Sequence, residues 1–316
     1  MIFYASGALA HVESDLVIDM LVRYEIDFLA SFAYRRDFDI RLPKLASRLR
    51  AERKKLHMMV DSGAFTAWSS GKEVNLEQLI DECNRLQDSY NDCLDMVFVS
   101  LDRLPGRKGI KPTAKEIADG ALESFQNFEK MTRLVRGPVK PVYHLGDPEW
   151  VARRYEKEVG YIGLGASRDV PYEARRRWAH EMGQRFAGHP LHGLAMTGTR
   201  MLRTVRWHSV DSASWIQTAG FGNVNWILPN GSLVAIPVSK ESPHNKKYDG
   251  HLSTLSKIHR DLLIAGLEKL DVPLEKILTT MHGRGAINML MYKRACDWAA
   301  KQSLTDERSL GVFDDA

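Results

Sequence analysis

The feature that most limits the fold of this chain is a regular alternation of short β-rich segments with longer segments of helical periodicity. The β-rich segments are Ile2–Ala5, Phe28–Phe32, His57–Val60, Met96–Leu101, Lys140–His144, Tyr161–Gly165, Leu191–Met196 and His208–Val210. The helical segments between them include Leu42–Lys55, Asn75–Tyr90, Thr113–Leu134, Pro148–Glu158 and Pro171–Phe186. This order predicts an α/β protein, either a (β/α)8 TIM barrel or a doubly wound open sheet, and eight strand–helix units favour the barrel.

The chain beyond the eighth β-rich segment follows a different pattern. Residues 224–238 hold the dipeptide Asn230-Gly231 between two β-rich runs, which is a strong signal for a β-hairpin. Two helices that would close the barrel are predicted over Leu252–Lys269 and Ile287–Lys301. Because the chain contains no internal repeat, we expect residues 1–316 to form one barrel domain. Its parts would be barrel strands over about 1–211, a hairpin over about 224–238, closing helices over about 251–302 and a tail over 303–316.

Composition indicates the setting of the protein more than its activity. Three cysteines in 316 residues, with no Cys-x-x-Cys pair, predict a reducing compartment and neither a disulfide framework nor a cysteine-rich zinc site. No apolar run is long enough to span a membrane, and the N-terminus lacks a basic leader, so we expect a cytoplasmic protein without membrane contact. The net charge of +4 is compatible with a polyanionic partner but too small to require one.

Polar residues and glycines stand where several β-rich segments end. They are Asp61, Asp102, His144, Gly163, Gly165 and Asp211. The carboxyl ends of barrel strands meet at one mouth, where active-site residues gather, so these positions would share one pocket. Three carboxylates in one pocket repel one another, and at least one should therefore hold a proton or meet a cation.

Each of these residues also has a purely structural interpretation. Asp61 and Asp211 could be helix caps or turn residues. Asp102 could form a surface ion pair with a neighbouring arginine, and His144 could be a histidine of the core. The two glycines could serve close packing alone, because a lone Gly-x-Gly is a weak sign of a phosphate loop. Their coincidence at successive strand ends favours the functional interpretation.

Taken in order, these motifs carry a resemblance to a known family. The segments concerned are Asp61-Ser62-Gly63, Asp102, Val142-Tyr143-His144-Leu145-Gly146, Gly163-Leu164-Gly165-Ala166 and Val210-Asp211. In sequence and in their placement at strand ends they resemble the tRNA-guanine transglycosylases. The segments His192–Gly198 and Trp207–Trp215 are more similar to the short phage-type relatives of the DpdA branch, which insert 7-deazaguanines into DNA.

The resemblance implies a role for each residue. Asp211 would be the nucleophile, Asp61 the general acid/base, and Asp102 the residue that holds the guanine edge. The remaining base contacts would come from His144, which stands where the tRNA enzymes have a glutamine, and from Ser62, Gly163 and Gly165. The tRNA enzymes bind a structural zinc through a Cys-x-Cys-x-x-Cys cluster and a later histidine. This chain has no such cluster, so no metal or other cofactor is expected.

The implied reaction is the exchange of guanine in DNA for a free 7-deazaguanine base, such as the 7-cyano form preQ0, through a covalent glycosyl-enzyme intermediate. If the protein is phage-encoded, it would act in the host cytoplasm. Four arginines are predicted to contact the nucleic-acid backbone: Arg168, Arg200, Arg203 and Arg206. Three alternatives stay open: a zinc-free tRNA transglycosylase, a catalytically inactive nucleic-acid-binding barrel, and a metal-dependent hydrolase with Asp61, Asp102 and His144 as ligands.

Overall fold

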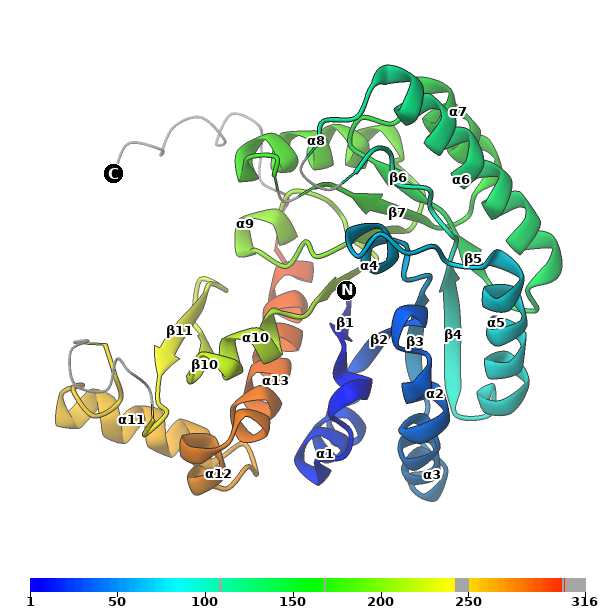
Figure 1. The fold of residues 1–316 in the computed structure, drawn as a ribbon. Coiled ribbons are helices and arrows are strands. Elements are labelled where there is room, and N and C mark those ends of the chain that lie inside the picture. The colour runs from blue at the N-terminus through cyan, green and yellow to red at the C-terminus, as the bar shows by residue number, and fades with distance from the viewer. Residues whose placement is uncertain (108–109, 168, 242–249, 303, 305–316) are drawn as a thin grey trace.

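The centre of the protein is a sheet of nine parallel strands, as seen in a computed structural model that describes residues 1–107, 110–167, 169–241, 250–302 and 304 (Figure 1). The strands are β1 (Ile2–Ser6), β2 (Asp27–Ser31), β3 (Leu56–Asp61), β4 (Leu94–Val99), β5 (Val139–Lys140), β6 (Val142–His144), β7 (Ile162–Gly165), β8 (Leu191–Gly193) and β9 (Ser209–Ser212). Their spatial order is β5-β4-β3-β2-β1-β9-β8-β7-β6. Every neighbouring pair in this order is parallel, as expected for strands joined through helices.

The sheet closes through one segment of chain. β5 pairs with β4, β6 pairs with β7, and only Pro141 separates β5 from β6. Proline has no N–H to donate to the ladder, so it divides one barrel strand into two short pieces. The carbonyl of Pro141 still accepts a hydrogen bond from the Gly163 N–H at 2.8 Å. The predicted (β/α)8 barrel is thus confirmed, and the doubly wound open sheet is excluded.

Helices surround this barrel (Figure 1). They are α1 (Asp15–Arg23), α2 (Arg36–Ile40), α3 (Leu42–Glu52), α4 (Ala64–Ser69), α5 (Leu76–Tyr90), α6 (Ala114–Leu134), α7 (Glu149–Glu158), α8 (Tyr172–Arg185), α9 (Thr199–Leu202) and α10 (Ser214–Gly220), with short 3-10 turns η1 (Ala8–His11) and η2 (Phe32–Tyr34). The ends of the long helices follow local rules. The Asn75 side chain caps α5, and Thr113 and Glu116 form a capping box at the start of α6.

The C-terminal part forms the predicted hairpin and two long helices, of which only the second closes the barrel as predicted; the first begins at Lys257 and lies to one side. The hairpin is β10 (Asn223–Ile227) with β11 (Leu233–Pro237), and Asn230-Gly231 lies in its loop. It is followed by α11 (Lys257–Glu268), α12 (Leu274–Thr279) and α13 (Met281–Ala300). α13 packs against β1, α1 and α10, so it takes the place of the eighth barrel helix, whereas the hairpin, α11 and α12 lie to one side (Figure 1). The buried Asn288 amide donates to the Trp215 and Asn223 carbonyls and so joins α13 to α10 and to β10.

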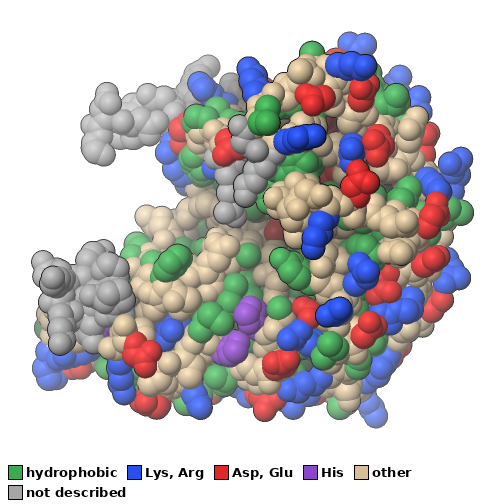
Figure 2. Space-filling view, in the orientation of Figure 1, with side chains coloured by type: hydrophobic (Ala, Val, Ile, Leu, Met, Phe, Trp, Pro, Cys, Tyr) green, Lys and Arg blue, Asp and Glu red, His purple; other side chains and the backbone are tan. Residues whose placement is uncertain are grey.

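Apolar side chains fill most of the barrel and the layer between strands and helices. Inside the barrel, Tyr4, Met59, Val97, Val99 and Val142 form one buried cluster. The outer helix faces carry charged side chains of both signs, intermixed over the face shown in Figure 2. Many of these form exposed ion pairs such as Arg50 with Asp92. Such exposed pairs contribute little stability and mark a solvated face.

One predicted strand is shorter than expected. The segment Leu191–Met196 was predicted to be β structure throughout, but β8 ends at Gly193. The cause lies at Ala195, whose φ of 54° is in the left-handed region and is incompatible with a continuing strand. The turn that results has a consequence for the site, because it directs the Ala195 N–H toward Asp211.

Candidate active site

The predicted site residues lie at the carboxyl ends of the barrel strands. Asp61 is the last residue of β3, Asp211 lies in β9, His144 ends β6, and Asp102 follows β4. The three carboxyl groups are close enough to affect one another, because the charges of Asp211 and Asp102 both raise the pKa of Asp61. Strand-end placement therefore brings together aspartates separated by up to 150 positions in the sequence.

Asp61 is held through one of its two oxygens. Its Oδ2 accepts hydrogen bonds from the Ser31 hydroxyl at 2.8 Å and from the Gly63 N–H at 3.0 Å. Gly63 has a φ of 78°, and a Cβ there would lie 2.8 Å from the Ala33 nitrogen, so only glycine fits this turn. Burial, together with the charges of Asp211 and Asp102, raises the pKa of Asp61 more than these two hydrogen bonds lower it. Asp61 is thus more readily protonated than an ordinary aspartate.

Asp211 has a different environment. Its Oδ2 accepts from the Ser6 hydroxyl at 2.5 Å, and its Oδ1 accepts from the Ala195 N–H at 2.8 Å. His192 Nε2 lies 3.3 Å from the same Oδ1. Burial would raise the pKa of Asp211, but the interactions with His192, Ser6 and Ala195 outweigh it and lower that pKa below its ordinary value. Asp211 is therefore the ionised member of the pair.

Asp102 and His144 form a pair of their own at the mouth. His144 Nε2 lies 2.9 Å from Asp102 Oδ2, and the His144 N–H donates to Asp147 Oδ2 at 2.7 Å. Burial would lower the pKa of His144, but the hydrogen bond and charge of Asp102 raise it. This pairing replaces the surface ion pair that Asp102 was expected to be able to form with a neighbouring arginine.

The glycines and Ser62 shape the surroundings of these groups. A Cβ at Gly165 would lie 2.7 Å from His144 Nδ1, and a Cβ at Gly163 would lie 3.1 Å from Val142. Gly165 therefore makes room for the His144 ring, and its carbonyl oxygen accepts a hydrogen bond from the Leu145 N–H. Ser62 is buried beside Asp61. Their predicted contacts with a base stay predictions.

The sequence interpretation missed a polar layer beneath Asp211. It consists of Lys140, Tyr161, His192 and Ser209. The Tyr161 hydroxyl is hydrogen-bonded to Ser209 Oγ, which lies 2.6 Å from His192 Nδ1. Lys140 is 0% exposed, and its Nζ sits 5.0 Å from the centre of the Tyr161 ring without a hydrogen-bond partner in the described part of the chain.

Three converging carboxylates were predicted either to hold a proton or to meet a cation, and Lys140 is the basic residue that lies among them. Burial lowers the pKa of Lys140 well below its ordinary value, whereas the charges of Asp211, Asp61 and Asp102 act in the opposite direction. A signal for it did exist. Lys140, Val142 and His144 alternate along one strand, so all three side chains point into the barrel.

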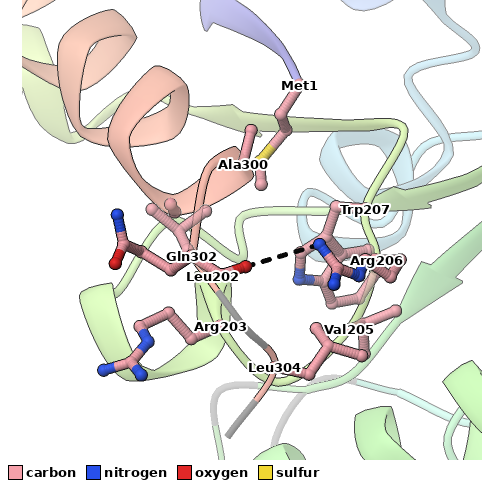
Figure 3. A pocket seen from close by; sticks show the side chains of 10 residues that line it. Met1, Leu202, Arg203, Val205, Arg206, Trp207, Ala300, Gln302 and Leu304 are labelled. Carbon is pink, nitrogen blue, oxygen red and sulfur yellow. Dashed lines mark hydrogen bonds between the residues drawn. The ribbon is translucent and has the colours of Figure 1, made fainter.

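Two of the arginines predicted to contact a nucleic-acid backbone, Arg203 and Arg206, lie away from the aspartates. Arg200 pairs with Glu173 at 3.0 Å. Arg203 and Arg206 line a small pocket with Met1 and Trp207, and Arg206 donates to the Gln302 carbonyl (Figure 3). Met1 precedes β1, so this pocket lies at the amino ends of the strands, away from the mouth. Arg168 lies outside the described residues.

Over the described ranges, no group of three or more His, Cys, Asp or Glu side chains is arranged to hold a metal ion, and Asp61, Asp102 and His144 do not form such a group. In the same ranges, no helix combines the length and apolar character needed to cross a membrane. Comparison with models of protein families and with curated proteins finds no match to this chain.

Proposed function

We propose that this protein is a base-exchange transglycosylase that replaces guanine in a nucleic acid, DNA in the first place, with a free 7-deazaguanine base. The observation that supports this most is the opposite effect of the barrel mouth on two carboxyl groups. The pKa of Asp61 is raised and that of Asp211 is lowered. A pair of carboxyl groups kept in different protonation states is what a two-step displacement at a sugar carbon requires.

In the first step, the ionised Asp211 attacks C1′ of the target nucleotide. The bond between C1′ and the guanine nitrogen breaks, and its electron pair leaves with the base. Asp61, which holds a proton, transfers that proton to a nitrogen of the departing guanine. The product of this step is a covalent ester between Asp211 and the sugar, together with free guanine.

In the second step, the incoming 7-deazaguanine gives its N9 proton to the Asp61 carboxylate. Its nitrogen attacks C1′, and the bond between C1′ and Asp211 breaks. Both aspartates return to their initial protonation states, so the exchange needs no external acid or base. Water must be kept from the ester, because hydrolysis would leave an abasic site.

Asp102 and His144 supply the group that distinguishes guanine. Asp102 Oδ2 is already occupied by His144, whereas Oδ1 has no hydrogen-bond partner within the described ranges. A carboxylate oxygen there accepts from guanine N1–H or the exocyclic amine, a pattern that adenine does not present. Leaving this acceptor unpaired would disfavour adenine by roughly 1–3 kcal/mol.

The polymer is inferred from the sequence. A guanine stacked within a duplex cannot reach a barrel mouth, so the target nucleotide is single-stranded or flipped out. The cysteine cluster that holds zinc in the tRNA enzymes has no counterpart here, since Cys83, Cys93 and Cys296 are separate and buried. We therefore favour DNA over tRNA.

The deciding experiment incubates purified protein with labelled guanine or preQ0 and with single-stranded DNA, duplex DNA or tRNA, followed by nucleoside mass spectrometry. We expect incorporation into DNA and a covalent protein–DNA adduct that survives denaturation. Asp211→Asn should abolish both while DNA binding persists, and Asp261→Asn on exposed α11 is the matched control. Incorporation only into tRNA would move the assignment to a zinc-free tRNA enzyme. Binding without exchange in the wild type would identify an inactive barrel.

A further inference from the structure

The polar layer beneath Asp211 is unusual for its position. Barrel interiors are normally filled by branched apolar side chains, as they are here around Met59 and Val97. Under Asp211, by contrast, a buried histidine, serine and lysine lie together with a partly buried tyrosine. Buried polar groups cost stability unless they are paired, so a chain of them below one carboxylate indicates a role in the work of that carboxylate.

We propose that His192 is a positioning residue for the Asp211 carboxylate, and that Ser209 and Tyr161 hold its ring in the tautomer that donates from Nε2. The catalytic part of this inference rests on the proposed function. The positioning of Asp211 by His192 does not, because it involves only side chains of this protein.

One arrangement of protons satisfies every group from Tyr161 to Asp211. An ionised Asp211 can only accept, so in this arrangement the His192 Nε2 that faces its Oδ1 carries the hydrogen. In a neutral imidazole Nδ1 is then an acceptor, and Ser209 Oγ, 2.6 Å away, donates to it. Because the single hydrogen of the Ser209 hydroxyl is donated to His192, its oxygen accepts a hydrogen bond from the Tyr161 hydroxyl. The order of donation therefore runs from Tyr161 through Ser209 and His192 to Asp211.

The neutral state of His192 follows from its surroundings. Burial and the charge of Lys140 lower the pKa of His192 to about 4, although the hydrogen bond and charge of Asp211 act in the opposite direction. His192 therefore has a single ring N–H at neutral pH, and its position is set by Ser209. Lys140 also lies over the Tyr161 ring, which restricts the orientation of the tyrosine at the start of the chain.

The His192 contact is arranged to strengthen during the reaction. At 3.3 Å the contact does not have the geometry of a formed hydrogen bond, and Nε2 has no other hydrogen-bond partner within the described ranges. Catalytic hydrogen bonds are often long in the free enzyme and shorten in the complex. The N–H thus keeps Oδ1 ionised before attack and again when the ester breaks.

The test measures the ionisation of Asp211 directly. Protein labelled with ¹³Cγ-aspartate is titrated by NMR, and the Asp211 signal is assigned through Asp211→Asn. We expect His192→Phe to raise the Asp211 pKa by about one to two pH units, the loss of one hydrogen bond to a charged group. Ser209→Ala should produce a similar rise, because Nδ1 then has no donor and the ring proton is free to move there.

Tyr4→Phe is the matched control. Tyr4 stands edge-on to the His192 ring at 6.0 Å but has no hydrogen bond to the chain of donors. The Tyr4→Phe substitution should leave the Asp211 pKa unchanged. Tyr161→Phe is the same chemical change but should raise the Asp211 pKa. Circular dichroism establishes that each variant is folded, and the serine and tyrosine variants remain usable if His192→Phe is not.

The activity readout separates this inference from the proposed function. In a wild type that exchanges bases, the acid limb of the single-turnover pH profile should move upward in His192→Phe and Ser209→Ala, because the reactive form of Asp211 is ionised. If the wild type shows no exchange but the NMR shift is present, the proposed function fails and the positioning stands. An Asp211 pKa that is equal in the wild type, His192→Phe and Ser209→Ala would overturn the inference.

Discussion

Replacing Lys140 with methionine should stabilise the fold while impairing the site. Lys140 is 0% exposed and its ammonium has no hydrogen bond in the described part of the chain. Methionine has a similar length, fills the same space and carries no charge. Replacing buried ionic groups with apolar ones of similar volume is often neutral or stabilising by about 1–4 kcal/mol. The attraction of Lys140 to Asp211, Asp61 and Asp102 reduces this gain, so we expect the lower half of that range.

The pH dependence gives this prediction a second test. Because the folded-state pKa of Lys140 is lowered, the unfolded chain binds its proton more tightly than the folded chain does. Wild-type stability therefore rises with pH between the folded-state pKa and the ordinary value of 10.5, and the advantage of Lys140→Met shrinks over the same window.

Thermal unfolding of both proteins at pH 6, 7.5 and 9 measures the effect. A chain of 316 residues unfolds with an entropy near 0.7 kcal/mol per kelvin, so 1–2 kcal/mol corresponds to a rise of about 2–3 °C. Lys115→Met on exposed α6 is the control for loss of a lysine charge. A Lys140→Met protein destabilised by several kcal/mol at every pH would refute the reasoning, because the ammonium would then be compensated within the fold.

Three further predictions concern the mouth. Ser31→Ala removes a hydrogen bond that lowers the pKa of Asp61, so the alkaline limb of the exchange–pH profile should move up by about one pH unit; an unchanged limb would argue against Asp61 as the acid. Gly165→Ala should displace the His144 ring and reduce guanine exchange by about 10- to 100-fold with little change in melting temperature, measured by steady-state kinetics. Gly63→Ala should cost about 1–3 kcal/mol in urea unfolding, and more than Gly71→Ala, where φ is also positive but a Cβ meets no atom within 4 Å.

The barrel could be predicted from the sequence because its signal is periodic and repeated. Each β-rich segment is followed by helical periodicity, and parallel pairing follows from that order. Closure could not be derived in the same way, since it depends on β4 and β7 meeting the two halves of one strand interrupted by Pro141. The short helices α4 and α10 were also missed. With six and seven residues, they are too short to show a periodic pattern.

The candidate site residues at the strand ends could be predicted from the sequence. Those that lie deeper inside the barrel were missed. Asp61, Asp102 and Asp211 stand at positions whose convergence any parallel barrel imposes. His192 looks like a core histidine in the sequence, because its neighbours on β8 are apolar or small. Its relation to Asp211 requires that β8 pair with β9 in the observed register, with His192 opposite Ser209. The pattern of strand and helix propensities does not predict which residues of β8 and β9 lie opposite each other.

The two carboxyl groups differ because polarity is distributed unequally beneath them. The two hydrogen bonds to Asp61 come from Ser31 and Gly63, beside it at the mouth, and burial prevails over them. Asp211 adds to its neighbours at the mouth a line of donors that reaches down into the barrel. Exchanging the two environments would reverse the direction in which each pKa is shifted, since both groups start from the same ordinary pKa. In the proposed reaction, the assignment of acid and nucleophile would therefore depend on the β7, β8 and β9 side of the barrel more than on the aspartates themselves.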